Sequence, residues 1–392
     1  MRLFILLPRV PFPIEKGDKL RAYHQIRHLS KTHEIILCAL NDAKLDGTAL
    51  PELSKYCRHI HVIRLTRPVI LWNIFLAFIT GKPLQIGYFY SRRAKKKIDS
   101  LIRTYRPDHI FCQLVRVAEY MRNINIPKTL DYQDVFSKGV ERRIHSASFY
   151  LKPILRLEYK RLLKYEHEVF DHFDNKVIIS APDRDLIPHA RKEDITVIPN
   201  GVDHSFFQPV EHEKNHDMVF IGNMGYPPNV DAAVFLVEKI LPLVRREYPA
   251  MTVLLAGATP HARVKALQSE TVRVTGWVDD IRECYAGGRI FIAPLQIGTG
   301  LQNKLLEAMA MKLPCITTPL ANSALGAREN EEILVGSTPA ELAGHVITLL
   351  KDSGKASQLA LKGRQFAIDN FSWERNTQKL EEIIMNTKNK QS

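Results

Sequence analysis

A glycine-rich loop that leads directly into a helix is the clearest candidate for chemistry in this chain of 392 residues. The stretch GTGLQNKLLEAMAMKLPCITTP runs from Gly298 to Pro319 and follows the apolar run FIAPL. Glycines let a phosphate approach the backbone closely, and the N–H groups at a helix N-terminus favour negative charge. The pattern therefore predicts a diphosphate site where a strand, a loop and a helix meet.

Two charged residues of that helix suit the same ligand. Lys304 falls in the first turn, where its ammonium adds a full positive charge beside a leaving diphosphate. Glu307 follows three residues later on the same side of the helix, and a carboxylate there can bind a ribose diol. An ordinary ion pair within the helix is the alternative that this spacing leaves open.

A second group of charges lies near the N-terminus. Lys16, Lys19 and Arg21 flank Gly17 in a loop and the helix that follows it. This density of positive charge suits a phosphate or an anionic acceptor. Helix charges exposed only to solvent are the alternative.

Asp131 and Asp134 follow a predicted strand, at the edge where functional groups of doubly wound folds gather. They are candidates for an acceptor contact or a catalytic base, and loop-capping or turn roles are the alternative. His24 and His28 lie one helical turn apart, but no third ligand has suitable spacing, so no metal site is predicted.

Short apolar runs alternate with helical patterns along the whole chain. In the first half the predicted strands are RLFILLP, EIILCAL, HIHVIRL, HIFCQLV, KTLDYQD and NKVIISAPDR, with helices over 17–31 and about 155–170. In the second half they are DMVFIGN, MTVLLAG, TVRVTGW, RIFIAPL and LPCITTP, with helices from about Asn229 and Leu301. Such alternation predicts α/β architecture with two doubly wound parallel sheets.

The segment IPNGVD, from Ile198 to Asp203, interrupts this alternation with Pro and Asn-Gly. We therefore expect an N-terminal domain over residues 1–198 and a C-terminal domain over 199–370. Residues 371–392 are expected to form a helix that begins at Ser372 and packs back on the N-terminal domain.

The net charge of +13 is unevenly distributed. Residues 1–200 carry 35 Lys and Arg against 21 Asp and Glu, hence +14, whereas residues 201–392 carry 20 against 21, hence −1. The apolar run Val69–Thr80 is shorter than the roughly 20 residues that cross a bilayer, and basic residues flank it. It suits a helix lying on anionic headgroups, with a buried helix and a solvated basic face as the alternative.

Three further observations concern partners and compartment. No recognition-helix, zinc-finger or RNP-like pattern accompanies the basic half, so we expect no nucleic acid partner. The five cysteines form no CxxC pair and most lie in apolar runs, which indicates buried thiols in a reducing compartment. The N-terminal MRLFILLPRVPFP is predicted to be a first strand rather than a signal peptide, so we expect a cytoplasmic protein, peripheral on the inner face of the plasma membrane.

The glycine-led motif resembles the donor-site signature GxGxxNKxLEAMA of glycosyltransferase family 4, whose members have the GT-B fold. The resemblance covers nearly the whole chain in the right order. Its other segments are 7–35, 131–137, 197–209, 220–232, 254–257, 274–286 and 290–300. It implies two Rossmann-like domains facing a central cleft, a nucleoside diphosphate sugar as donor, retention of the anomeric configuration, and neither metal nor cofactor.

The resemblance also implies roles for particular residues. Glu307 would bind the ribose hydroxyls, the backbone at Gly300 and Leu301 would bind the diphosphate, and Gly17 would approach the donor phosphate from the opposite domain. The loop with Trp277 and Val278 would hold the base, with packing as an alternative role for Trp277. The predicted donor site also includes Gly222, Gly298, Thr299 and Asn303.

The chain departs from the family pattern at two places. Thr299 stands where many members have a glutamate, eight residues before the ribose-binding one. The sequence after Phe220-Ile221-Gly222 also lacks the Arg and Lys that neutralise the diphosphate in many members. Lys304 is therefore the leading candidate for that charge.

The sequence thus predicts a retaining glycosyltransferase that acts on a lipid-linked or polysaccharide acceptor in bacterial cell-surface glycan synthesis. The alternatives with the same fold are a sugar-nucleotide epimerase, a phosphorylase and a non-catalytic nucleotide-sugar-binding subunit. A nicotinamide-dependent dehydrogenase is disfavoured because no GxGxxG follows the first strand.

Overall fold

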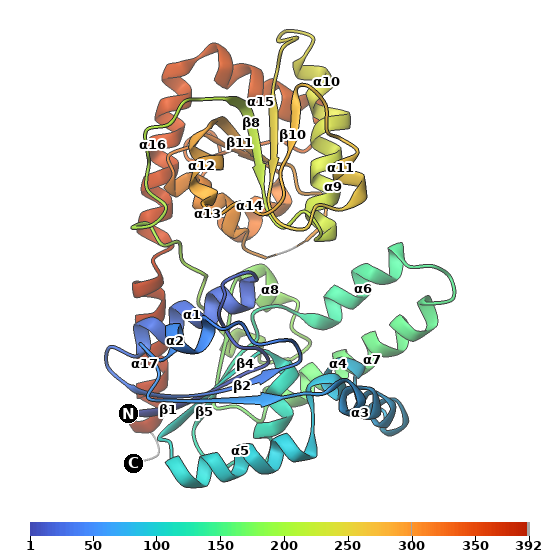
Figure 1. The fold of residues 1–392 in the computed structure, drawn as a ribbon, viewed down its shortest axis with the longest axis vertical. Helices are drawn as coiled ribbons and strands as arrows, with labels where there is room; N and C mark the ends of the chain where they lie inside the picture. Colours follow the sequence, from blue (N-terminus) through green and yellow to red (C-terminus); the bar gives the residue numbers. More distant parts are fainter. Residues whose placement is uncertain (299, 390–392) are drawn as a thin grey trace. The chain divides into compact units, whose positions relative to one another are not determined.

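The computed structural model describes residues 1–298 and 300–389 and divides into two compact units (Figure 1). The first unit comprises Met1–Pro199 together with the C-terminal segment that begins at Trp373. The second unit comprises Asn200–Ser372. The boundaries expected after residues 198 and 370 lie within two residues of these divisions.

The first unit is built on a seven-stranded sheet in the order β3-β2-β1-β4-β5-β6-β7, with every pairing parallel. The register places Leu3 between Ile35 and His109. The strands are β1 (Arg2–Leu7), β2 (Glu34–Asn41), β3 (His59–Arg64), β4 (His109–Gln113), β5 (Lys128–Asp131), β6 (Asn175–Ile178) and β7 (Thr196–Val197). Because the chain proceeds outward from β1 to β3 and then returns to β4, the strand order reverses between β1 and β4.

Side chains of β1 alternate between two cores. Leu3, Ile5 and Leu7 enter the core on one face of the sheet, whereas Phe4 and Leu6 enter the core on the other. This follows from the two-residue period of a strand, and burial of both faces explains the uninterrupted apolar run. The helices of this unit are α1 (Gly17–Leu29), α2 (Ala49–Leu53), α3 (Arg67–Thr80), α4 (Leu84–Phe89), α5 (Arg92–Tyr105), α6 (Phe136–Ser146), α7 (Lys152–Phe170), α8 (Ala181–Asp185) and α17 (Trp373–Asn389), with short 3-10 turns at Val115–Met121 and Lys192–Asp194.

The C-terminal helix α17 packs beside α1 in the first unit (Figure 1). Leu380 and Ile384 of α17 are fully buried in the same core as Leu3. The ring of Trp373 stacks on His24 of α1, with centroids 4.7 Å apart. Burial of these side chains explains why the last helix belongs to the first unit although the second unit precedes it in sequence.

The second unit has a six-stranded parallel sheet in the order β10-β9-β8-β11-β12-β13. Its strands are β8 (His216–Ile221), β9 (Val253–Ala256), β10 (Val272–Val274), β11 (Gly288–Ala293), β12 (Cys315–Thr317) and β13 (Leu334–Val335). Its helices are α9 (Pro227–Phe235), α10 (Leu241–Val244), α11 (Ala262–Lys265), α12 (Ile281–Ala286), α13 (Asn303–Ala310), α14 (Pro319–Leu325), α15 (Pro339–Lys351) and α16 (Ser353–Asn370), with a π-helical turn at Leu236–Ile240. The strand order of this unit reverses between β8 and β11.

The cysteine side chains lie in the interior of the protein. All five cysteines are buried and free, as the apolar runs around them predicted. Within residues 1–298 and 300–389, no helix combines the length and the apolar character that crossing a bilayer requires.

A fully buried ion pair joins distant parts of the first unit. Arg21 Nε of α1 donates to Asp131 Oδ2 at the end of β5 over 2.6 Å, and both side chains are completely buried. Arg21 Nη1 also donates to the carbonyl oxygen of Ile198 over 2.9 Å, and Gln25 Nε2 donates to Asp131 Oδ2 over 3.3 Å. The pair therefore links α1, β5 and the segment after β7.

We expect Asp131→Asn to lower the free energy of unfolding by about 3 kcal/mol or more, because it removes the carboxylate charge that pairs with the buried Arg21 cation. Urea unfolding followed by circular dichroism measures the change. The exposed pair of Lys31 and Glu374 supplies the control, and Glu374→Gln should cost about 1 kcal/mol or less. Equal losses in the two variants would contradict a structural role for the buried pair.

Candidate functional site

The loops that follow β8 and β11 meet where the strand order of the second sheet reverses. Such a point opens a crevice outside the carboxyl ends of the strands, and ligands of doubly wound folds bind there. The loop after β8 begins at Gly222, and the loop after β11 includes residues 294–298 and 300–302, just before the start of α13. The predicted donor-binding motif therefore occupies the position that this topology favours for a ligand.

Gly222 lies in a crowded position, where any larger residue would require neighbouring side chains to shift. A Cβ there would lie 2.8 Å from Asn229 Nδ2 and 3.2 Å from Lys304 Cε. The backbone just after β9 also lies close to Gly222. A Cβ on Gly257, whose φ is +137°, would lie 1.9 Å from the carbonyl oxygen of Gly222. The missing Cβ at Gly222 thus allows the lysine side chain to lie against the backbone.

The ammonium of Lys304 joins the two loops. Lys304 Nζ donates to Asn229 Oδ1 of α9 over 2.8 Å and to Gln302 Oε1 over 3.0 Å. Burial lowers the pKa of Lys304 to about 8, although the nearby Glu307 carboxylate opposes this shift. Both acceptors are uncharged, so they position the cation without neutralising it.

Glu307 is oriented by a buried tyrosine. Tyr285 of α12 is fully buried, and its hydroxyl donates to Glu307 Oε2 over 2.7 Å. Burial raises the pKa of Glu307, whereas the Tyr285 hydrogen bond and the charge of Lys304 act in the opposite direction. One oxygen of the carboxylate is therefore engaged by tyrosine, while the Lys304 ammonium donates its hydrogen bonds to Asn229 and Gln302.

The glycine loop adopts a conformation that only glycine tolerates well. Gly298 has φ of +105° and Gly300 has φ of +93°, both in the region that L side chains rarely adopt. Thr299, which the sequence placed in the donor site, lies outside the described residues. Gln302 at the N-cap of α13 makes no capping hydrogen bond, and its amide instead donates to the carbonyl oxygen of Gly300 over 3.1 Å. The first turn of α13 therefore receives no cap from this side chain.

Two neighbours anchor the start of α13. Leu301 is partly buried and packs against the core of the second unit. Asn303 Oδ1 accepts from Asn200 Nδ2 over 3.1 Å, which ties the helix start to the beginning of this unit. These contacts make Asn303 an anchoring residue and leave the Leu301 and Gly300 backbone as the candidate anion ligands.

The predicted base-binding loop follows β10 at the same edge of the sheet. Trp277 is 67% exposed, so the packing role left open by the sequence does not describe it. Val278 is partly buried against the core of the second unit. The exposed indole presents an apolar face to solvent, and its role toward a base remains a prediction.

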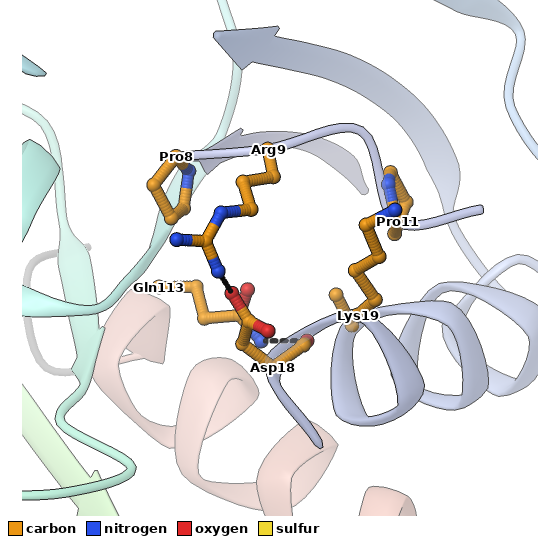
Figure 2. A pocket seen from close by; sticks show the side chains of 7 residues that line it. Pro8, Arg9, Pro11, Asp18, Lys19 and Gln113 are labelled. Carbon is orange, nitrogen blue, oxygen red and sulfur yellow. Dashed lines mark hydrogen bonds and ion pairs between the residues drawn. The ribbon is translucent and has the colours of Figure 1, made fainter. Parts of the chain in front are cut away.

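In the first unit, Gly17 is the first residue of α1, and a hydrogen-bonded cluster surrounds the beginning of that helix. Figure 2 shows Arg9 extending from the loop after β1 to Asp18, with Arg9 Nη1 and Asp18 Oδ2 2.7 Å apart. Gln113 Nε2 donates to the carbonyl oxygen of Asp18 over 3.1 Å (Figure 2). Lys19 also lines this small pocket, and its ammonium lies 3.6 Å from Glu15.

Two of the residues predicted in this region need a correction. Arg21 is buried against Asp131, so it is neither a phosphate ligand nor a solvated helix charge. The same burial argues against Asp131 as a catalytic base, because its carboxylate is held by an arginine and has no exposed surface. Asp134 is exposed, and its Oδ1 accepts from the Val135 N–H at the start of α6, which is a local capping contact. Lys16 is exposed at the N-cap of α1.

Sequence reasoning missed Asn229 and Tyr285 as parts of the site. Asn229 lies 75 residues from Lys304, and Tyr285 lies 22 residues from Glu307. Both fall within the segments that carried the family resemblance, at 220–232 and 274–286. Neither is charged, so a search for residues that neutralise a diphosphate passes over them.

Together these residues can bind a phosphorylated diol. The glycine loop and the start of α13 offer N–H groups to an anion, and Lys304 supplies a cation beside them. Glu307 lies about one turn further along α13, where its carboxylate can accept from hydroxyl groups. A diphosphate joined to a ribose matches this order of groups along one helix.

Comparison with known proteins agrees with this location. Residues 215–352, within the second unit, match the family model described as Glycosyl transferases group 1. A protein of Klebsiella pneumoniae, described as an uncharacterized 44.6 kDa protein in the cps region, is 21% identical over 399 residues, which cover 94% of this chain and 96% of that protein. The match to the group 1 model thus lies wholly within the second unit.

Solved structures resemble the whole chain. Sucrose-phosphate synthase from Thermosynechococcus elongatus matches with a TM-score of 0.73 at 14% identity, over 98% of this chain and 99% of that one. HepE from Anabaena, solved in complex with UDP, matches with a TM-score of 0.71 at 16% identity, over 98% of this chain and 100% of that one. A glycosyltransferase from Rickettsia africae ESF-5 matches with 0.65 at 17% identity, over 98% of each chain. The predicted fold class is confirmed: the chain has two parallel-sheet α/β units and the GT-B fold of these glycosyltransferases.

Proposed function

We propose that this protein is a retaining glycosyltransferase that transfers a sugar from a nucleoside diphosphate sugar to an acceptor hydroxyl. The observation that carries the proposal is the arrangement at α13, where a glycine loop, the ammonium of Lys304 and the carboxylate of Glu307 follow one another. The group 1 match covers this helix, and HepE, a structural relative, has been solved with UDP. Membership of family 4 and retention of configuration rest on the motif resemblance.

The acceptor in this proposal is a lipid-linked sugar or a growing polysaccharide at the bacterial cell surface. Support comes from the Klebsiella pneumoniae relative, which is described as lying in the cps region. The WaaG structure, with a TM-score of 0.65 at 13% identity, is described as a glycosyltransferase of lipopolysaccharide biosynthesis. Both descriptions concern assembly of surface glycans, and we extend that class of acceptor to this chain.

In the proposed reaction the anomeric C–O bond of the donor breaks while negative charge grows on the departing diphosphate. Lys304 and the N–H groups at Gly300 and Leu301 stabilise that charge because they are held in place before the reaction begins. Glu307, oriented by Tyr285, binds the ribose hydroxyls. The acceptor oxygen bonds to the anomeric carbon as the departing diphosphate takes the acceptor proton, and the proposed step uses no metal ion or further cofactor.

A thermal-shift panel of nucleotides and nucleotide sugars tests the donor class. Stabilisation by a nucleoside diphosphate sugar is expected, because a ligand that binds only the folded state raises the melting temperature. Product analysis with a labelled donor then separates the reactions. A transferase requires an acceptor, an epimerase does not, and a phosphorylase requires free phosphate.

We expect Lys304→Ala and Glu307→Ala each to lower turnover by about 100-fold or more, because each removes a group that contacts the donor. Steady-state kinetics with the donor identified by the panel measures the loss. Lys265→Ala in α11 and Glu283→Ala in α12 are matched controls, because both side chains are exposed charges of the same unit. Unchanged turnover in both site variants would remove the basis of the assignment.

The pH dependence of nucleotide binding tests the role of Lys304 separately. The pKa of Lys304 is about 8 without ligand, so the ammonium loses its proton as the pH rises through that value. The Kd for a nucleoside diphosphate should therefore be nearly constant at neutral pH and rise by up to about tenfold per pH unit above 8. Isothermal titration calorimetry at a series of pH values measures it.

Lys304→Arg is the control for that titration, because a guanidinium keeps its charge throughout this range. The variant should bind with an affinity that no longer falls above pH 8. If the variant and the natural protein lose affinity in parallel, another group is titrating and Lys304 does not neutralise the diphosphate.

A further inference from the structure

Helix α3 of the first unit presents a broad apolar face that the protein leaves uncovered. Its exposed large apolar side chains are Val69, Leu71, Trp72, Phe75, Phe78 and Ile79. Leu71, Phe75 and Ile79 recur at intervals of four, so they occupy one side of the helix. Leu71 is 68% exposed and Ile79 is 64% exposed, whereas Ile70 and Ala77 are buried against the protein. One side of α3 thus anchors the helix and the other faces solvent.

A second uncovered apolar segment lies at the turn between α6 and α7, which run side by side and project from the sheet of the first unit (Figure 1). Its exposed residues are Phe149, Tyr150, Leu151, Ile154 and Leu157. Phe149 is 85% exposed, which is unusual for so large an apolar ring. Sequence periodicity did not single out this turn.

The two apolar segments belong to one surface, because Arg161 connects them. Ile154, Leu157 and Arg161 lie at intervals of three and four residues, hence on one side of α7. Arg161 Nη2 donates to the carbonyl oxygen of Phe78 over 3.0 Å, at the end of α3. The same guanidinium lies over the Phe78 ring, 5.5 Å from its centroid. The exposed side of α7 therefore leads directly to the exposed side of α3.

Basic residues outnumber acidic ones in the sequence segments that form this surface. Between Glu52 and Asp99 the sequence has ten Lys and Arg and no Asp or Glu. Between positions 142 and 165 the one acidic residue is Glu158, which is buried and accepts from the N–H groups of Leu84 and Gln85 at the start of α4. Arg156, Lys160 and Lys164 of α7 are exposed. An apolar surface bordered by cations is complementary to anionic lipid headgroups above an acyl layer.

We propose that the exposed sides of α3 and of the α6–α7 turn together form a docking surface for an anionic lipid bilayer, here named the α3/α7 surface. A helix of 14 residues is about 21 Å long, too short for the roughly 30 Å hydrocarbon core, so α3 lies in the plane of the interface. Trp72, Phe149 and Tyr150 supply aromatic rings of the kind that favour the headgroup region. The proposal stands on exposure and charge and does not depend on the transfer reaction.

Flotation of the full chain with lipid vesicles tests the proposal. The protein should float with vesicles that contain phosphatidylglycerol and much less with vesicles of phosphatidylcholine alone, and added salt should weaken the binding. Trp72→Ser/Phe75→Ser and Phe149→Ser/Tyr150→Ser should each reduce the partition coefficient by about tenfold or more, because each removes two apolar rings from the interface. Independent losses in the two variants would show that both segments contact lipid.

The matched control is Leu50→Ser/Leu361→Ser, which removes two exposed apolar side chains outside the α3/α7 surface. It should float like the natural protein. Thermal shift with a nucleoside diphosphate in every variant checks that the fold and the nucleotide site survive, so failure of docking is distinguished from failure of the proposed function. Equal flotation of all variants, or equal loss in the control, overturns the proposal.

A second copy of the chain is the competing occupant of this surface. Light scattering without lipid, at several protein concentrations, measures the mass of the natural protein and of both surface variants. A monomer that floats with anionic vesicles supports the proposal. A dimer that the surface variants abolish, combined with no flotation, assigns the surface to self-association and overturns it.

Discussion

The close approach of a lysine to the backbone at Gly222 is the constraint on which the candidate site depends. Lys304 crosses from α13 to Asn229 so close to Gly222 that a Cβ there would lie 3.2 Å from Lys304 Cε. The ammonium is held by two neutral acceptors, which leave its charge available to an anion. Any Cβ at Gly222 would displace both the amide and the lysine.

The same site illustrates how backbone N–H groups and one lysine together prepare positive charge for an anion. The start of α13 contributes N–H groups with no cap from Gln302, and positive φ at Gly298 and Gly300 keeps the loop backbone in a conformation open to a close ligand. Tyr285 holds the Glu307 carboxylate from the buried side. Groups that are oriented before a ligand arrives need little reorganisation when it binds.

In the first unit, basic residues serve either in a buried ion pair or on the exposed surface. Its most buried cation, Arg21, neutralises Asp131 inside the protein and ties α1 to β5. Other cations are exposed, among them Arg156, Lys160 and Lys164 of α7, and large apolar side chains of α3 and α7 are exposed as well. Net charge alone cannot separate these two uses, because a buried pair and a solvated patch contribute the same residue types to the sequence.

Much of the fold follows from local patterns. The expected helix over 17–31 appears as Gly17–Leu29, the helix from about Leu301 begins at Asn303, and the predicted strands are present in both sheets. Boundaries shift by a few residues because capping and the ends of strand pairing depend on neighbouring segments. The site residues that sequence reasoning did not find, Asn229 and Tyr285, have no distinctive pattern along the chain.

The sequence by itself determined which segments are strands and helices, where the glycine-led helix begins, and that Lys304 and Glu307 share one side of it. These properties depend on periods of two and 3.6 residues and on the conformational freedom of glycine, all of which are local. Only the tertiary structure decided that Asp131 forms an ion pair with Arg21, 110 residues away, and that Lys304 donates a hydrogen bond to Asn229. Packing brings such partners together. The free energy of burying a charged side chain, rather than the position of that side chain along the sequence, decides whether its charge is paired within the protein or available to a ligand.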